Sequence, residues 1–358
     1  MCKLDSYIVD LCHKRLFMAA VNLKELAKIL NLSISTVSKA LRDSHEIGAS
    51  TKERVLAKAK ELDYSPNPFA SGLRRNKSKT VAVVVPEVAN NYFALAINGI
   101  ESVAQEKDYH VLIYLTHEDF EKEKRIMKHL ENKRVDGILM SVTMHTNQCD
   151  HLFDIQQKGI PIVMFDRICH EIETAKITTD DYTSGMNATK HLIDNGAKEI
   201  AFLSLGDEVS IVQKRKGGFL EELEKNNIAT TPNKIVNCND SDESNYQKIK
   251  KLLNGNQRPD AIFASVEKLA TTTYEVCKEL HINIPKDLKV ICFSNLATAS
   301  LLSPSLSTVT QPAYEIGKTA AEVMFKYLDK NKTYIPNENI VLHSTLFIRD
   351  SSQNSSKK

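Results

Sequence analysis

The sequence predicts two kinds of fold in one chain, an all-α unit over residues 22–79 followed by an α/β unit over residues 80–349. In the first stretch, apolar residues recur at the three- and four-residue spacing of short amphipathic helices. In the second, short β-rich apolar runs alternate with segments long enough to be helices, as in parallel sheets covered by helices on both faces. A chain of 358 residues is long enough for two or three such domains.

The first helix is expected to begin after Asn22. The Asn22 side chain can cap the helix, and Glu25 stands three residues further on, as in a capping box. The apolar face of this helix consists of Leu23, Leu26, Ala27 and Leu30. Asn31 then falls where the turn needs a left-handed backbone, which asparagine tolerates best after glycine.

A second helix is expected after Ser33, which can cap it. Its inner face is Val37, Ala40 and Leu41. Its outer face carries short or cationic side chains, namely Ile34, Ser35, Thr36, Ser38 and Lys39. Such side chains suit a helix that lies in the major groove of DNA, so we interpret the pair as a helix-turn-helix; the alternative is an ordinary helical hairpin.

A third helix is expected over residues 48–62. Its inward side chains would be Val55, Leu56, Ala59 and Leu62. Pro66 ends this helix, and Asn67 can cap a short further helix. We therefore expect a DNA-binding headpiece over residues 22–66 and a hinge helix with its linker over residues 67–79.

Charge is unevenly distributed along the chain. The whole sequence has 47 basic and 45 acidic residues, but residues 22–79 alone hold 12 basic and 6 acidic ones, a net charge of +6. Residues 80–358 carry about −5. A basic headpiece on a mildly acidic body fits nucleic-acid binding at one end only, with a steep dependence on salt.

The seven cysteines are scattered, and none forms a Cys-x-x-Cys pair. We therefore expect neither a disulfide framework nor a metal site, and a reduced cytoplasm as the setting. No apolar run approaches the length of a membrane span, and charged residues interrupt residues 7–20, which makes a poor signal peptide. Residues 1–21 are interpreted as an N-terminal extension with the natural start near Met18, and residues 350–358 as a disordered tail.

The DNA-binding region carries a specific order of residues: Thr36-Val37-Ser38 in the second helix, then Tyr64, Pro66-Asn67, Ala70 and Leu73. In this order the sequence resembles the LacI/GalR family of bacterial transcription regulators, and the resemblance continues through residue 349. The chain departs from the family at Asn31, Gly48 and Arg42, where glycine, a capping serine and asparagine are usual.

The resemblance implies how this region would meet double-stranded operator DNA. The second helix would read base edges through Ile34, Ser35 and Lys39. Residues that anchor phosphates would be Ser33, Thr36, Ser38 and Thr51, and further DNA-contacting residues would be Arg42, Tyr64, Asn67 and Ala70. Leu73 of the hinge helix would wedge a base step in the minor groove and bend the DNA.

The second unit is expected to form more than one sheet. Its predicted strands are Val81–Val85, His110–Leu115, Gly137–Ser141, Ile160–Phe165, Glu199–Ser204, Lys234–Cys238, Ala261–Ser265 and Leu288–Phe293. Predicted helices between them include residues 94–107, 120–132, 183–195, 212–226 and 268–280. This series is too long for one comfortable sheet, so we expect two lobes.

The resemblance implies the type I periplasmic-binding-protein fold, in which three chain crossings join two similar lobes. We place the crossings near residues 178–181, 308–312 and 341–343. Lobe 1 would then cover residues 80–178 and 312–341, and lobe 2 would cover residues 179–308 and 342–349. No heptad pattern follows residue 340, so a coiled-coil tetramer is not expected.

Polar residues follow the carboxyl ends of these strands, where open α/β sheets bind ligands. The candidates for effector binding are Tyr92, Phe93, Asp166, Arg215, Glu267, Ser294, Asn295 and Gln311. Asn91 and Arg167 stand at the same strand ends as two of these candidates. Carboxylates, an arginine fork, amides and aromatic faces are what a polyhydroxylated ligand needs. Arg215 matches the family's effector-binding arginine. Ser294 stands where many relatives carry aspartate, which counts against a simple hexose pocket and shifts weight to Asn295.

Several candidates also have a structural interpretation. Tyr92 and Phe93 could instead belong to the core, and Asp166 could cap a turn. Glu267 could pair with Lys268 at the surface.

Together these inferences predict a ligand-responsive transcription regulator, and by resemblance a repressor of a catabolic, carbohydrate-linked operon. A homodimer would bind a near-palindromic operator, and a small effector would switch it, either a sugar or sugar derivative or a nucleoside or purine. The alternative is a solute-binding protein of a transport system, which would need export. No glycine-rich phosphate loop, nucleophile elbow or metal-ligand spacing appears, so we expect no enzyme, no catalytic residue and no cofactor.

Overall fold

The computed structural model describes residues 21–64, 77–132, 134–146, 148–206, 209–229, 234–238 and 241–353. The chain divides into two compact units between Lys77 and Ser78. The expected hinge residues Asn67, Ala70 and Leu73 lie outside the described residues, and so do residues 1–20. Among the described residues, no helix is both long enough and apolar enough to span a membrane.

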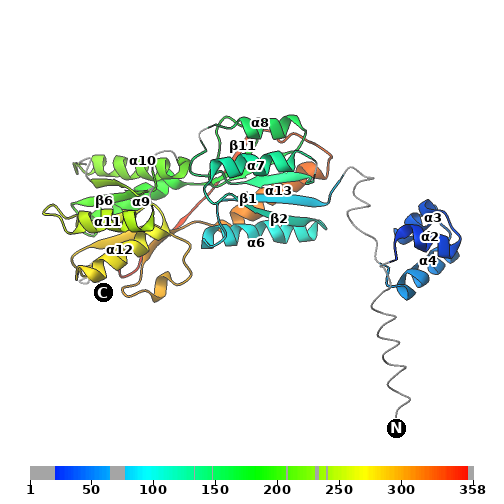
Figure 1. Cartoon of the computed structure of the whole chain (residues 1–358). Coiled ribbons are helices and arrows are strands. Elements are labelled where there is room, and N and C mark those ends of the chain that lie inside the picture. The colour runs from blue at the N-terminus through cyan, green and yellow to red at the C-terminus, as the bar shows by residue number, and fades with distance from the viewer. Residues whose placement is uncertain are drawn as a thin grey trace, which may run out of the picture. The chain divides into compact units, whose positions relative to one another are not determined.

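Residues 21–64 fold into helices α2 (Leu23–Leu30), α3 (Ile34–Leu41) and α4 (Ala49–Glu61) (Figure 1). Their shared core consists of Leu26, Ala27, Val37, Ala40, Val55 and Ala59. The prediction that Leu56 faces inward is wrong, because its side chain is 52% exposed. Val55 and Ala59 lie one turn apart on the packed face of α4, whereas Leu56 is rotated about 100° from Val55 around the helix axis.

The helix caps of this unit are the ones that the sequence predicts. Asn22 Oδ1 accepts a hydrogen bond from Glu25 N, and Glu25 Oε2 accepts one from Asn22 N, each at 3.0 Å, which completes the capping box. Asn31 adopts the left-handed backbone, with a φ of 50°. Ser33 Oγ accepts a hydrogen bond from Thr36 N at 3.0 Å. These local contacts fix the angle between α2 and the start of α3.

Lobe 1 of the second unit is built on a parallel sheet with the strand order β11-β5-β4-β3-β1-β2. Its strands are β1 (Thr80–Val85), β2 (His110–Leu115), β3 (Gly137–Met140), β4 (Ile162–Phe165), β5 (Ala175–Thr179) and β11 (Glu338–Leu342). Helices α6 (Asn91–Glu106) and α13 (Ala313–Leu328) cover one face, and α7 (Phe120–Leu130) and α8 (Asp150–Gln157) cover the other (Figure 1). The first pair packs closely: a Cβ at Gly317 would lie 1.9 Å from the carbonyl oxygen of Ala96.

Lobe 2 repeats this layout with the strand order β12-β10-β9-β8-β6-β7, in which only β12 is antiparallel to its neighbour. Its strands are β6 (Ile200–Ser204), β7 (Ile235–Asn237), β8 (Ala261–Ala264), β9 (Lys289–Phe293), β10 (Ser307–Thr310) and β12 (Thr345–Phe347). Its helices are α9 (Asp181–Asp194), α10 (Ser210–Lys225), α11 (Asp242–Leu253) and α12 (Glu267–Glu279), with a short 3₁₀ helix at Ala299–Leu301. The two-lobed fold class predicted from the sequence is confirmed.

The chain passes between the lobes three times: from β5 to α9, from β10 to α13 and from β11 to β12. Strands β5, β10, β11 and β12 were not among the predicted strands. They are short, and β11 and β12 have half-exposed or exposed residues, so they lack the continuous apolar run that marks a buried parallel strand.

Two sequence predictions about the chain's covalent and terminal structure are wrong. Cys149 and Cys169 form a disulfide, with their Cα atoms 6.6 Å apart, although no Cys-x-x-Cys spacing announces it. The tail expected to be disordered from residue 350 is ordered through residue 353. Ser351 and Ser352 are buried, and Ser351 Oγ donates a hydrogen bond to Val290 O at 2.6 Å.

Candidate functional site

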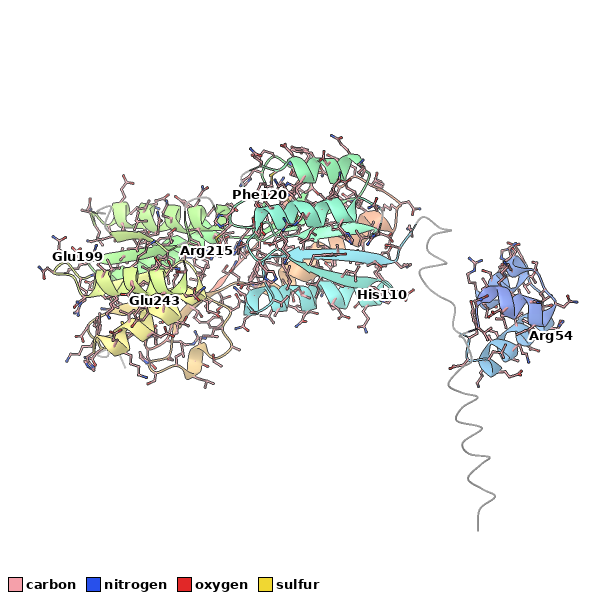
Figure 2. All side chains as sticks on the ribbon, in the orientation of Figure 1. Arg54, His110, Phe120, Glu199, Arg215 and Glu243 are labelled. Carbon is pink, nitrogen blue, oxygen red and sulfur yellow. A yellow bond between two sulfur atoms is a disulfide. The ribbon has the colours of Figure 1, made fainter. Side chains whose placement is uncertain are left out.

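The carboxyl ends of strands from both lobes meet at one cavity in the second unit. It is lined by Asn90, Tyr92, Phe93, Asp166, Arg167, Ile211, Arg215, Val266, Glu267, Phe293, Ser294, Asn295 and Gln311. All eight residues that the sequence singled out as effector-binding candidates are in this lining. Figure 2 shows Arg215 on the side of lobe 2 that faces lobe 1. The common signal is position, because the candidates lie beyond the ends of β1, β4, β6, β8, β9 and β10, with Arg215 on the helix that follows β6.

Arg215 of α10 is the most constrained side chain of the cavity, and it is buried. Its Nε donates to Asp181 Oδ1 at 2.7 Å, and its Nη1 donates to the carbonyl oxygen of Ser265 at 2.7 Å. Its guanidinium carbon lies 3.8 Å from the ring centre of Phe293. Asp181 and Phe293 thus fix the position of the fork, while Nη2 has no hydrogen-bond partner among the described residues.

Asp166 and Arg167 follow β4 directly and face the cavity. Asp166 has a left-handed backbone with a φ of 61°, a costly conformation for a non-glycine residue and one that tends to cluster at functional sites. Burial raises the pKa of Asp166 to about 6, although the positive charges of Arg167 and Arg215 lower it. Arg167 Nη1 donates to Glu118 Oε1 at 2.7 Å, and Arg167 Nε lies 3.9 Å from Asp166 Oδ2, so this cation pairs with one carboxylate outside the cavity and one inside it.

Tyr92 and Phe93 lie at the start of α6, and both interpretations of them hold. Both are buried in the core of lobe 1, and both line the cavity. Their rings meet edge to face with centres 5.3 Å apart. The Tyr92 hydroxyl has no partner of normal hydrogen-bond geometry among the described residues. Burial raises the pKa of this hydroxyl, and the nearby charge of Asp166 raises it further.

Two sets of hydrogen bonds start at the end of β9: one ties it to the residue after β8, and the other reaches two of the chain crossings. Ser294 Oγ donates to Glu267 Oε2 at 2.6 Å. The expected alternative pairing of Glu267 with Lys268 is not formed, since Lys268 pairs with Asp242. Asn295 Nδ2 donates to the carbonyl oxygen of Gln311 at 2.7 Å, and Gln311 Nε2 donates to Thr179 Oγ1 at 3.0 Å.

Unpaired buried polar atoms gather around this cavity. In the described part of the chain, four lining residues carry a buried atom without a hydrogen-bond partner: Tyr92 Oη, Arg167 Nε, Arg215 Nη2 and Asn295 Oδ1. Other such atoms, including Thr116 Oγ1 and Ser344 Oγ, belong to residues outside the lining. Leaving one such group unpaired costs roughly 1–3 kcal/mol. The cavity itself holds only about 50 Å³, room for a few water molecules. The arrangement therefore favours a polar ligand, but the lobes must part to admit one larger than water.

Four lining residues were not singled out from the sequence: Asn90, Ile211, Val266 and Phe293. Arg167, which follows the same strand end as Asp166, does line the cavity. Asn90 directly precedes Asn91, so position along the strand end could have found it. Ile211 and Phe293 are apolar, and nothing in their local sequence separates them from core residues.

The outer face of α3 is exposed, as the sequence predicts for a surface that meets DNA. Ser33, Ile34 and Ser35 are exposed, and Thr36, Ser38, Lys39 and Thr51 are partly exposed. The Lys39 ammonium forms an ion pair with Glu46, a partner that sequence reasoning missed. Arg42 Nε donates to the carbonyl oxygen of Ser38 at 2.9 Å, and its Nη2 donates to Ser38 Oγ at 3.1 Å.

Tyr64 differs from the other candidates for DNA contact. It packs against the core of the first unit, and burial raises its pKa. The core of the first unit therefore holds the Tyr64 ring, just after α4 ends.

Comparisons with known proteins agree in both units. Residues 22–67 match the family model "Bacterial regulatory proteins, lacI family", and residues 189–352 match "Periplasmic binding protein-like domain". The ribose operon repressor of Haemophilus influenzae is 31% identical over 92% of this chain and 98% of that protein. The transcriptional repressor PurR of Vibrio vulnificus is 29% identical over 92% of this chain and 97% of that protein. The lac repressor dimer bound to operator and the anti-inducer ONPF has the same fold, with a TM-score of 0.81, 20% identity and coverage of 94% of this chain and 100% of that one.

Proposed function

This chain belongs to the lacI family of bacterial regulatory proteins and is a ligand-responsive DNA-binding regulator. We propose that it represses a catabolic operon. We further propose that a sugar, sugar derivative or nucleoside, bound in the cavity between the lobes, sets its affinity for the operator. The single observation that carries the choice of ligand is the cluster of unpaired buried polar atoms around the cavity. The transport alternative is not supported, since the relatives match over nearly their whole length and are named as repressors.

The unpaired atoms describe the ligand's chemistry. Arg167 Nε and Arg215 Nη2 can only donate, Asn295 Oδ1 can only accept, and the Tyr92 hydroxyl can do both. A ligand hydroxyl is also both donor and acceptor, so a molecule with several hydroxyls satisfies all four atoms at once. A sugar fits this requirement, and the similarity to a ribose operon repressor supports the same class.

The hydrogen bonds around Asn295 offer a route from ligand to hinge. Asn295 contacts Gln311 at one crossing, and Gln311 contacts Thr179 at another. A ligand that binds the free Asn295 oxygen therefore touches a side chain already tied to two of the three connections between the lobes. We propose that this is how occupancy of the cavity biases the angle between the lobes, which by linkage changes DNA affinity.

The DNA half of the proposal rests on the outer face of α3. As a homodimer, the protein would present two copies of α3 to a near-palindromic operator in the bacterial cytoplasm, where that DNA is. Lys39 would exchange Glu46 for a base edge or phosphate, and Ser33, Thr36, Ser38, Arg42 and Thr51 would set the register on the backbone. Tyr64, Asn67, Ala70 and Leu73 would complete the contact through the hinge.

We further propose that the ligand leaves the cavity chemically unchanged. The buried carboxylate of Asp166 lies 3.9 Å from Arg167 Nε and accepts a hydrogen bond from Ser141 Oγ at 3.4 Å, contacts that suit a group that binds a ligand. Incubation of the protein with its ligand, followed by mass spectrometry of the small molecule, would detect turnover; a new product would overturn this part of the proposal.

The test combines DNA and ligand. Purified protein is mixed with fragmented genomic DNA, and bound fragments are sequenced with and without a panel of pentoses, hexoses, disaccharides and nucleosides. The proposal expects one near-palindromic motif upstream of a catabolic gene cluster, with binding that changes for one member of the panel. Enrichment of a motif that no polyhydroxylated compound affects would contradict the ligand class, and enrichment of no motif in any arm would contradict the regulator.

A further inference from the structure

A second cavity, of about 160 Å³, adjoins the first one, and Arg167 lines both. Its lining includes Cys149, at the start of α8, and Cys169 and Glu171, in the segment between β4 and β5. On the lobe 2 side it is closed by residues at the start of α10, among them Ser210. The proposed effector function uses none of these residues except Arg167.

The two sulfur atoms and one carboxylate oxygen converge at the wall of this second cavity. Cys149 Sγ, Cys169 Sγ and a Glu171 oxygen lie within 4.8 Å of one another. Glu171 Oε2 is 2.8 Å from Cys169 Sγ and 3.4 Å from Cys149 Sγ. In the disulfide neither sulfur carries a hydrogen, so the carboxylate faces two electron-rich atoms that cannot donate to it. The contact becomes favourable only when protons or a cation lie among the three atoms.

Reduction of the disulfide gives thiols, which can donate protons to Glu171 or, as thiolates, bind a cation together with it. Two equivalents of a small thiol give the Cys149–Cys169 bond two electrons and two protons, which leaves two protein thiols and one small-molecule disulfide. A cytoplasmic protein spends most of its time in this reduced state. When a thiol then coordinates a metal ion, it binds as the thiolate and its proton passes to solvent.

We propose that reduced Cys149 and Cys169, together with Glu171, bind a divalent thiophilic cation of the Zn²⁺ type. Zn²⁺ takes cysteine sulfur and carboxylate oxygen in tetrahedral sites, and three protein ligands leave a fourth position open. All three residues line the second cavity, which has room for a water molecule as the fourth ligand. Thiolate ligands select such an ion over Mg²⁺ and Ca²⁺, which prefer all-oxygen sites. His170 lines the same cavity, but its ring nitrogens are not among the converging atoms.

A cation bound at this site would join two segments of lobe 1 that lie next to the first cavity. Cys169 and Glu171 lie in the segment that begins with Asp166 and Arg167, two lining residues of the first cavity. Cys149 anchors the opposite segment between β3 and α8. A bound cation ties these two segments together, so we expect it to change ligand affinity in the first cavity while its own binding remains measurable without any effector.

The test uses the full chain with Cys2→Ser and Cys12→Ser, which removes the two cysteines that lie outside the described residues. The protein is reduced with a phosphine under anaerobic conditions and titrated with Zn²⁺ against a chromophoric chelator. A parallel titration with Cd²⁺ follows the ultraviolet thiolate-to-metal charge-transfer band. We expect one equivalent of metal per chain, the charge-transfer band, and release of protons on binding.

Substitutions at the site then assign the ligands. Cys149→Ser and Cys169→Ser should each weaken Zn²⁺ binding by about 100-fold or more, and Glu171→Gln by about tenfold. The matched control is Cys277→Ser, which removes a buried free cysteine that lines a different cavity and should leave affinity unchanged. Thermal melts of the metal-free variants check that each one folds.

The opposite results are equally clear. Failure of the reduced parent protein to bind Zn²⁺ above the level of the Cys149→Ser, Cys169→Ser double variant would overturn the proposal. Retention of binding after Glu171→Gln would overturn the three-ligand site. After removal of the phosphine and admission of air, oxygen can take the two electrons of the thiol pair. Oxidation to the disulfide at the same rate with and without Zn²⁺, with no metal retained, would identify a redox pair only and would also overturn the proposal.

Discussion

The outer face of α3 and the cavity between the lobes both carry charged side chains, but they hold them differently. On α3, Lys39 pairs with Glu46 and Arg42 bonds to Ser38, all at partly or fully exposed positions. In the cavity, Arg215 and Asp166 are buried, and several neighbouring polar atoms have no partner. Exposed ion pairs contribute roughly 0–1 kcal/mol and exchange readily for other partners. Buried groups cannot turn to bulk water, so an unpaired one needs a bound water or a ligand as its partner.

Because of this difference, the DNA-facing surface and the ligand cavity are recognised by different structural features. A DNA-facing surface is recognised by its shape, charge and exposed short side chains, because water satisfies whatever the protein leaves free. A ligand cavity is recognised by its unsatisfied atoms. Changes at the cavity should therefore have larger effects than changes on α3, and the predictions below follow that order.

Arg215→Ala should have the largest effect. It removes the donors beside the ligand and leaves Asp181 buried without its cation, which costs about 3–5 kcal/mol of stability. We expect effector affinity, measured by calorimetry, to fall roughly 100-fold or more. Arg215→Lys keeps the positive charge but loses the planar guanidinium group with its several donors. It replaces the alanine variant in this test if that variant does not fold. Arg125→Ala, at an exposed arginine of α7, is the matched control and should change neither quantity. Unaltered affinity in Arg215→Lys would move the ligand away from this arginine.

Lys39→Ala should change which sequences the protein prefers. A side chain that reads a base edge contributes about 1–3 kcal/mol of discrimination at its position. Selection of bound sequences from a random DNA pool should therefore show one position of the motif relaxed. Lys60→Ala removes an exposed lysine of α4 and should lower affinity uniformly at most. The same motif from wild type and Lys39→Ala would show that Lys39 reads no base.

Effector affinity should depend on pH through Asp166. Its pKa in the folded protein is about 6, above the ordinary value of 3.8, so the free protein loses stability as pH rises through this window. If the carboxylate accepts ligand hydroxyl groups, affinity is full above pH 6 and falls below it, by about tenfold at pH 5. Calorimetry across this range checks the slope. Asp166→Asn should flatten it, and an equally steep slope in that variant would assign the titration to another group.

Glu46→Gln should have the smallest effect. It removes the exposed partner of Lys39 and leaves that lysine free for DNA. Because the pair contributes roughly 0–1 kcal/mol, operator affinity should rise only a few-fold, with the gain largest at low salt. Fluorescence anisotropy with a labelled operator measures it. Glu53→Gln, at an exposed glutamate of α4, gives the same change of net charge without touching Lys39. An equal increase in operator affinity in both variants would show that net charge, not release of Lys39, causes the effect.

The same contrast separates what the sequence predicts from what it cannot. The capping box at Asn22, the left-handed Asn31 and the Ser33 cap depend on residues three or four apart, and all three predictions are confirmed. Leu56 was misplaced because apolar spacing alone does not say how wide the packed face of α4 is. In the cavity, the strand-end rule found eight lining residues. That they bind an effector stays a prediction.

Contacts between distant segments were beyond such reasoning. Arg215 and Asp181 are 34 residues apart and come together only because α9 and α10 pack side by side. The Cys149–Cys169 pair and the burial of Ser351 and Ser352 depend likewise on segments that the fold brings together. A single sequence carries no local signal for any of these.

We propose that ligand occupancy of the cavity controls the affinity of the protein for its operator DNA. The most direct test is the dissociation constant for the captured operator with and without a saturating cavity ligand, in wild type and in Arg215→Lys. We expect a change of about 5- to 150-fold in wild type, in either direction, and little change in the variant at the same ligand concentration. A ligand that fills the cavity, shown by calorimetry, and leaves operator affinity unchanged would contradict it.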